Sequence, residues 1–188
     1  NDPGGGAITP PVTQAVLQIS LTAGPSEGVD VHSIAFTDAG GGSMTSIPMV
    51  DLYEDTNNNG AFDGAATDNP IVQNMQISSS PFTFSISPPR SIAANVTVHW
   101  ILVYQFGSSG GTYIPTLDPP AQVTAMGVTS SQNATITGSK ITGGTYTTGG
   151  TGVQWYAIAA AGAPSARIYS SGVYDGGNQR FLVFGGST

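Results

Sequence analysis

Apolar and polar residues alternate along the chain in short runs, and Gly, Pro, Asn and Ser separate the runs. Alternation with a period of two is the pattern of a half-buried β-strand, whereas clusters of turn-forming residues mark strand ends. No convincing amphipathic helix, which would repeat near 3.6 residues, stands out. We predict strands over these segments: residues 16–22, 29–37, 48–55, 71–78, 82–87, 95–106 and 122–129.

Two of these strands carry more detail. In residues 29–37 the apolar phase slips between Val31 and Ile34, which predicts a β-bulge. Residues 95–106 form the clearest strand, and one continuous apolar face is predicted for Val96, Val98, Trp100, Leu102, Tyr104 and Phe106. Strands of this number and spacing are typical of a sandwich with an apolar inner face and a Ser/Thr outer face. The predicted fold class is all-β, an Ig-like or jelly-roll-type β-sandwich with an appended C-terminal β-hairpin.

The predicted β-sandwich occupies residues 13–130, and three segments flank it. Residues 1–12 are rich in Gly and Pro and are expected to form an extended N-terminal arm. Residues 131–152 are rich in Thr and Gly, which favours a linker or weak strands. Residues 153–188 are predicted to form the hairpin segment. No apolar run approaches the ~18 residues that a membrane-spanning helix needs, so membrane insertion is not expected.

The composition restricts the partners of the chain. The formal net charge is −7, with 4 Lys and Arg residues among 188. Nucleic acids and anionic lipid surfaces are bound by clustered Lys and Arg, so neither is an expected partner. The sequence has no cysteine and begins at Asn1, without an initiator Met or a basic and apolar leader. We expect a mature, secreted chain that is extracellular or at the cell surface.

One segment has the residue spacing of a calcium loop. Residues 55–63 match its first nine positions, in which side chains at 1, 3 and 5, a carbonyl at 7 and an acid at 9 bind Ca²⁺ and Gly at 6 makes the turn. Position 12 holds Ala66 instead of an acid, and Asp68 replaces that acid only if the loop is longer. The alternative is an Asx-rich turn without metal, because Asn, Asp and Gly favour turns by themselves. The predicted ligands of one structural Ca²⁺ are Asp55, Asn57, Asn59, Ala61, Asp63 and Asp68.

Residues suited to catalysis are few. The two histidines, His32 and His99, both fall within predicted strands. A Ser/His/Asp set with Asp30 would lack a nucleophile elbow and a helix to carry it. Two histidines without cysteine make a weak case for zinc. We therefore expect the chain not to be an enzyme.

Two sequons mark candidate N-glycosylation sites, Asn133 and Asn95. Asn95 begins a predicted core strand, which favours Asn133 as the acceptor. Chance sequons are common in a chain this rich in Thr, so the sites depend on the source having the machinery.

The C-terminal residues 155–186 resemble a kelch repeat. The resemblance rests on Trp155-Tyr156-Ala157, Pro164-Ser165-Ala166-Arg167, Val173-Tyr174-Asp175 and Phe184-Gly185-Gly186. Kelch repeats build the four-stranded blades of propellers, and one repeat cannot bury its hydrophobic face alone. The resemblance implies either a fragment of a longer protein or a hairpin that packs on the sandwich or on a neighbouring subunit. More loosely, the sandwich is similar to modules of large bacterial surface proteins over Leu17–Pro25, Asp51–Gly60 and Val123–Val128.

These expectations lead to two functions. The first is a non-enzymatic extracellular structural protein, a subunit of a surface filament or layer that assembles with copies of itself by strand exchange. The arm or the hairpin would supply the strand, through Ala7, Ile8, Val12, Tyr169, Val173, Phe181 and Val183. The alternative is an adhesion or glycan-binding module of a larger kelch-containing cell-surface protein, with cell-surface glycans as its partners.

Overall fold

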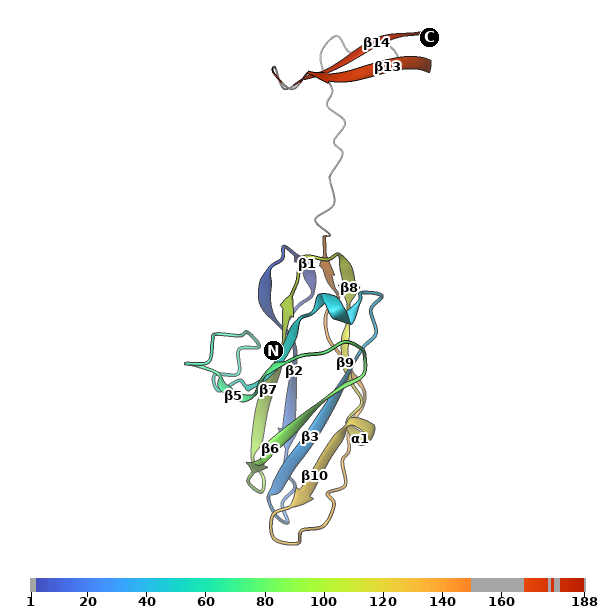
Figure 1. Ribbon diagram of the computed structural model, residues 1–188. Helices are drawn as coiled ribbons and strands as arrows, with labels where there is room; N and C mark the ends of the chain where they lie inside the picture. The colour runs from blue at the N-terminus through green and yellow to red at the C-terminus, as the bar shows by residue number, and fades with distance from the viewer. Residues whose placement is uncertain (1–2, 150–167, 176, 178–179, 188) are drawn as a thin grey trace. The chain divides into compact units, whose positions relative to one another are not determined.

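The computed structural model describes residues 3–149, 168–175, 177 and 180–187. The chain divides into two compact units, Asn1–Gly152 and Val153–Thr188. Figure 1 shows the strands, and the colour from blue to red follows their order along the chain.

The first unit contains the larger part of the secondary structure. Its elements are β1 (Gly6–Ile8), β2 (Val12–Thr22), β3 (Val29–Asp38), the 3-10 helix η1 (Met44–Ser46), β4 (Met49–Glu54), β5 (Asn69–Met75), β6 (Phe82–Ile92), β7 (Thr97–Phe106), β8 (Gly111–Tyr113), β9 (Pro115–Leu117), α1 (Pro119–Gln122), β10 (Val123–Gly127), β11 (Ile141–Thr142) and β12 (Tyr146–Thr148). The second unit contains β13 (Ile168–Asp175) and β14 (Arg180–Ser187), which pair in antiparallel fashion.

Two larger sheets form the sandwich of the first unit. One has the order β2-β7-β4-β5 with every neighbour antiparallel, and the other has the order β10-β3-β9-β11 with β6 also paired to β3. A smaller sheet, β1-β12-β8, lies at one end of the unit, and β10 lies toward the opposite end (Figure 1). The prediction of an all-β sandwich with an appended hairpin is confirmed.

Aromatic side chains join the two sheets in one buried cluster. Phe82 on β6 and Tyr104 on β7 have ring centroids 6.2 Å apart, and Phe36 on β3 lies 5.9 Å from Phe84. Such pairs contribute about 0.5–1.5 kcal/mol beyond the area that they bury. Trp100 belongs to the same cluster, so the alternating aromatic positions of β7 anchor the core as expected.

The predicted apolar face of β7 is correct at its centre and wrong at its start. Trp100 is 1% exposed, whereas Val96 precedes the strand and is 42% exposed. Ile101 and Val103 on the opposite face are also buried, against Tyr53 and the partly buried Phe62. The reason is that β7 lies between β2 and β4 and a loop covers its outer face, so this strand is buried on both sides.

The sequence predicted the bulge of β3 correctly but placed the end of β6 too early. The bulge predicted in β3 is confirmed, because its register shifts between Val31 and Ser33 against β6. Strand β6 is longer than the predicted 82–87 and continues through Pro88 and Pro89 to Ile92. Proline is tolerated there because β6 pairs only with β3 among the described strands, and an edge strand does not need every N–H.

The N-terminal arm is attached to its own sandwich. Gly6, Ala7 and Ile8 pair in parallel with β12, which lies in the segment predicted as a linker or weak strands. Tyr146 of β12 donates its hydroxyl hydrogen bond to the Pro3 carbonyl at 2.8 Å. The Gly/Pro-rich arm and the Thr/Gly-rich segment 131–152 therefore both contribute strands to the first unit.

Close backbone contact explains why glycine is needed where the arm meets β12. A Cβ at Gly144 would lie 2.3 Å from the Gly5 nitrogen, and one at Gly5 would lie 2.3 Å from the Thr145 carbonyl oxygen. Real Cβ atoms essentially never approach backbone atoms this closely, so any side chain forces the two segments apart.

Gly144→Ala will detach the arm and lower the free energy of unfolding by about 1–3 kcal/mol, the usual cost of forcing atoms into a packed site. Hydrogen exchange at the Gly6 amide, which donates to the Thr145 carbonyl at 2.9 Å, reports the detachment directly. Gly149→Ala is the matched control, because nothing lies within 4 Å of the Cβ built there. Equal exchange at Gly6 in both variants would contradict the prediction.

Candidate cation-binding loop

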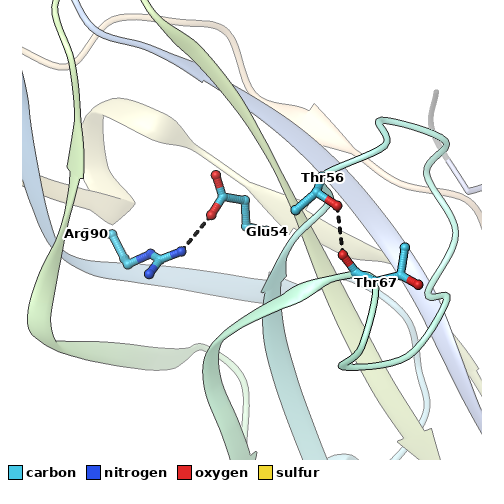
Figure 2. A network of polar contacts seen from close by, with 4 residues as sticks. All are labelled: Glu54, Thr56, Thr67 and Arg90. Atoms are coloured by element: carbon cyan, nitrogen blue, oxygen red, sulfur yellow. Dashed lines mark hydrogen bonds and ion pairs between the residues drawn. The ribbon is translucent and has the colours of Figure 1, made fainter.

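The loop that joins β4 to β5, residues 55–68, is closed at its base by hydrogen bonds. Thr56 donates its hydroxyl to the Thr67 carbonyl at 2.7 Å (Figure 2). The amides of Thr67 and Asp68 both donate to the Gly64 carbonyl, at 3.0 and 2.9 Å. Gly64 has a φ of 92° and Gly60 has a φ of 75°, so the two glycines supply the left-handed turns that the loop requires.

Asp55 is the buried anchor of the loop and is 2% exposed. Its Oδ2 accepts from the Gly60 amide at 2.8 Å and from Gln18 Nε2 at 2.6 Å. Its Oδ1 accepts from the Asn59 amide at 3.3 Å. The first position of the predicted calcium loop therefore faces the interior of the turn.

Two polar side chains of the loop converge on one carboxylate oxygen of a third residue, Asp63. Asn57 and Asn59 donate from Nδ2 to Asp63 Oδ2, at 2.9 and 2.7 Å. The Oδ1 atoms of the same two residues accept from the Asn59 and Ala61 amides, at 3.2 and 2.7 Å. The Asn57 and Asn59 hydrogen bonds lower the pKa of Asp63, because they stabilise its charged form.

Asp68 brings a buried carboxylate to the same loop. Its side chain is fully buried, and Oδ2 accepts from the Asp63 amide at 2.8 Å. Its Oδ1 is buried and makes no hydrogen bond of normal length in the described part of the chain, although the Thr56 amide lies near enough to the carboxylate to stabilise its charged form. Burial raises the pKa of Asp68, and the charges of Asp55 and Asp63 raise it further. The residue expected to replace Ala66 in a longer loop thus lies close to two other predicted ligands.

The loop stands on the outer face of the four-stranded sheet. Phe62 packs on Tyr53 with ring centroids 4.7 Å apart, and these rings cover Ile101 and Val103. Gln18 on β2 binds the loop at two residues, since its Nε2 also lies 3.0 Å from Asn58 Oδ1. A single loop therefore connects β4 with β2 across β7.

The nearby acids outside the loop already have partners. Glu54 forms an ion pair with Arg90 of β6 at 2.6 Å (Figure 2). Asp51 accepts from the Asn74 amide and from Gln105 Nε2. The chain has four basic residues, Arg90, Lys140, Arg167 and Arg180, and Lys140 lies beside Asp118 and Gln122. Neither Arg90 nor Lys140 is positioned to neutralise the carboxylates of the loop.

Within the described ranges, no three His, Cys, Asp or Glu side chains come together in a group that could hold a metal ion. A cation in this loop would accordingly need the amide and carbonyl oxygens as well as the carboxylates. His99 Nδ1 forms a hydrogen bond with the Ser20 hydroxyl at 2.9 Å, and His32 lies on β3 in the other sheet.

No described helix has the length and apolarity needed to cross a membrane.

A cavity of about 380 Å³ lies at the other side of the sandwich, between β2 and β10. Residues 135–139 and Ile141 cover it, and Ile19, Val31 and Val123 line its floor. Among the described residues its lining contains no titratable side chain, so it offers no acid, base or thiolate to a substrate.

The remaining predicted site residues lie in several parts of the chain. Asn95 and Asn133 are both exposed; Asn95 lies in the turn before β7, not in the strand, and has a φ of 61°. Ile8 and Val12 pack on the core of their own unit, and Ala7 is exposed on β1. Val173 is exposed on β13, whereas the side chains of Tyr169, Phe181 and Val183 lie outside the described residues.

No protein-family model, curated protein or solved structure matches the chain. The kelch-like repeat therefore stays a prediction, and Trp155 to Arg167 of it lie outside the described residues. Sequence reasoning missed Gln18 as a contact of the loop, since a glutamine in an alternating strand carries no mark of such a role. The uninterrupted apolar run Trp100–Tyr104 was a usable signal for a strand covered on both faces.

Proposed function

We propose that the chain is a non-enzymatic extracellular structural protein that assembles with copies of itself through strand exchange. The observation that carries the proposal is the hairpin of β13 and β14, two strands that pair only with each other among the described strands. Unpaired edges recruit further strands, and a two-stranded hairpin is marginal in water by itself.

The side chains of the hairpin add to this argument. Ile168, Val173 and Tyr174 are 60%, 52% and 60% exposed. Exposed apolar side chains on an open hairpin favour a partner surface that would cover them. The chain also has a single lysine, the residue that most often protects sheet edges from pairing.

The arm supports a second form of the same assembly. Strand β1 pairs with β12 inside one chain, so a terminal exchange would recreate these contacts between two copies. The hairpin is the stronger candidate for the donated segment, because the arm already has a partner in its own unit. A head-to-tail contact whose rotation does not close into a ring would grow as a filament or layer.

The assembly is tested by comparing the full chain with two deletions. Electron microscopy and light scattering at high concentration should show polymers of the full chain, and deletion of residues 165–188 should lower their yield while the melting of the first unit stays unchanged. Deletion of residues 1–12 lowers the yield only if the arm is the donor. A full chain that stays monomeric at high concentration would refute the proposal.

A second candidate, an adhesion or glycan-binding module of a kelch-containing surface protein, is favoured by one observation. Val173 and Tyr174 are neighbours on β13, so they point to opposite faces of the hairpin, and both are exposed. In a propeller, adjacent blades cover both faces of each blade. Exposed apolar side chains on both faces of the hairpin would therefore be covered in a complete propeller. Binding of the monomeric chain to a glycan array, lost in Tyr174→Ala, would support this candidate.

A further inference from the structure

We propose that loop 55–68 is a calcium site whose coordination sphere is closed by Asp68 instead of the residue at position 12. The other ligands are the side chains of Asp55, Asn57, Asn59 and Asp63 and the carbonyl of Ala61. The inference does not depend on the assembly proposed above, because it concerns the first unit alone.

The donor set selects a hard cation. Every proposed ligand atom is an oxygen, and the chain has no cysteine. Ca²⁺ takes six to eight oxygens in a flexible geometry, and backbone and Asn carbonyls are among its usual ligands. Zn²⁺ and other borderline metals favour nitrogen and sulfur ligands, which the loop does not offer.

The buried oxygen of Asp68 is the observation that points to a ligand. A buried carboxylate oxygen without a hydrogen-bond partner is costly, and native proteins rarely leave one unsatisfied. Asp55 and Asp63 lie close enough to act on Asp68 electrostatically. Because no three acidic side chains of the described ranges form a metal-holding group by themselves, a divalent cation would bind Asp68 Oδ1 together with the amide and carbonyl oxygens of the loop, and its charge would reduce the repulsion that Asp55 and Asp63 exert on Asp68.

The two asparagines are already directed at the same point. Their Nδ2 atoms both bind Asp63 Oδ2, so each terminal amide lies within hydrogen-bond distance of that carboxylate. Each Oδ1 accepts one backbone amide, from Asn59 and Ala61, and keeps a second lone pair. In the bound state the Asn57 and Asn59 oxygens would use this lone pair for the cation beside Asp63.

The position of the loop determines what the cation would do. Asp55 is bound to Gln18 on β2, and Phe62 of the loop covers Ile101 and Val103 on β7. Ordering the loop would therefore stabilise the contacts across three strands of one sheet. The site is structural, and its expected signature is a change in stability.

The test is thermal unfolding of the full chain after chelator treatment, with and without CaCl₂. A ligand at a hundredfold excess over its Kd stabilises the native state by about 2.7 kcal/mol. For a chain of this length that corresponds to a rise in melting temperature of roughly 5–10 °C. Extracellular calcium modules bind with Kd values of about 0.1–1 mM, so the hundredfold excess requires a titration to about 10–100 mM calcium.

The variant Asp68→Asn tests whether Asp68 binds the cation or only supports the structure of the loop. The variant removes a buried charge but keeps an oxygen for the Asp63 amide, so its calcium-free melting temperature should equal or exceed that of the wild type. The calcium-dependent rise should be lost. Asp118→Asn is the matched control, since it makes the same change at an exposed residue whose side chain caps no amide of α1, and it should keep the full rise.

Three results would overturn the proposal. They are identical melting curves in calcium and chelator, an equal calcium shift in Asp68→Asn and wild type, or a magnesium shift as large as that of calcium. Should Asp68→Asn fail to fold, Asp63→Asn replaces it, because Asp63 is exposed and its loss leaves the core intact. Isothermal titration calorimetry with CaCl₂ should then show weaker binding than in the wild type, and unchanged affinity would refute the ligand set.

Discussion

Replacing Trp100 with Ala will lower the free energy of unfolding by about 3–5 kcal/mol, the cost typical of a fully buried Trp or Phe. Trp100 is 1% exposed at the centre of β7, between Ile19 of β2 and Glu54 of β4. Its loss removes apolar contacts with both neighbouring strands and leaves a cavity that the packed sandwich cannot close. Denaturant unfolding followed by far-UV circular dichroism measures the change.

Val96→Ala is the control for this prediction. Val96 belongs to the same apolar alternation in the sequence, but it is 42% exposed and precedes the strand. Substitutions at exposed positions usually change stability by less than about 0.5 kcal/mol. If the two variants lost the same stability, the assignment of Trp100 to the core of the sandwich would be wrong.

In calcium-free buffer, Asp55→Ala will lower the free energy of unfolding by about 2–3 kcal/mol. The variant removes the acceptor of the Gly60 amide and of Gln18 Nε2. A buried donor left without an acceptor costs about 1–3 kcal/mol. Denaturant unfolding in the presence of chelator isolates this effect from any contribution of a bound cation.

The control for Asp55 is Asp118→Ala, which removes an exposed carboxylate that caps no amide of α1. It should leave stability within about 0.5 kcal/mol of the wild type. The Asp55 variant should also expose Tyr53, because the turn that places Phe62 on this ring depends on Asp55. Unchanged stability of Asp55→Ala would show that the loop is held by Phe62 alone.

The alternation of side chains was sufficient to place most strands of the sandwich. Burial on one face of a sheet imposes a period of two, and residues 16–22 and 82–87 show this period in their amino-acid order. The slip between Val31 and Ile34 likewise marked the bulge of β3. Strands β1 and β12 left no such pattern, because each has three residues, too few to show a period of two.

The candidate loop was recognisable because its ligands are close in sequence. Asp55, Asn57 and Asn59 occur at alternate positions before Gly60, and Asp63 follows three residues after it. Local backbone geometry alone brings such residues together. From the sequence, Asp68 could replace the acid missing at position 12 only if the loop was longer than the standard one. Its burial, its free oxygen and its nearness to Asp55 and Asp63 depend on how the loop closes at Thr56 and Thr67.

The all-β class, the strands that bury one face and the spacing of the loop can all be read from the amino-acid order, because each depends on neighbouring residues. Which residues distant in sequence share a surface depends instead on the folded chain. Folding places Gln18 against Asp55 across 37 residues, and it pairs the N-terminal arm with β12. It also covers the outer face of β7 with Phe62. These contacts depend on the order of strands in the sheet, and no local period or propensity encodes that order.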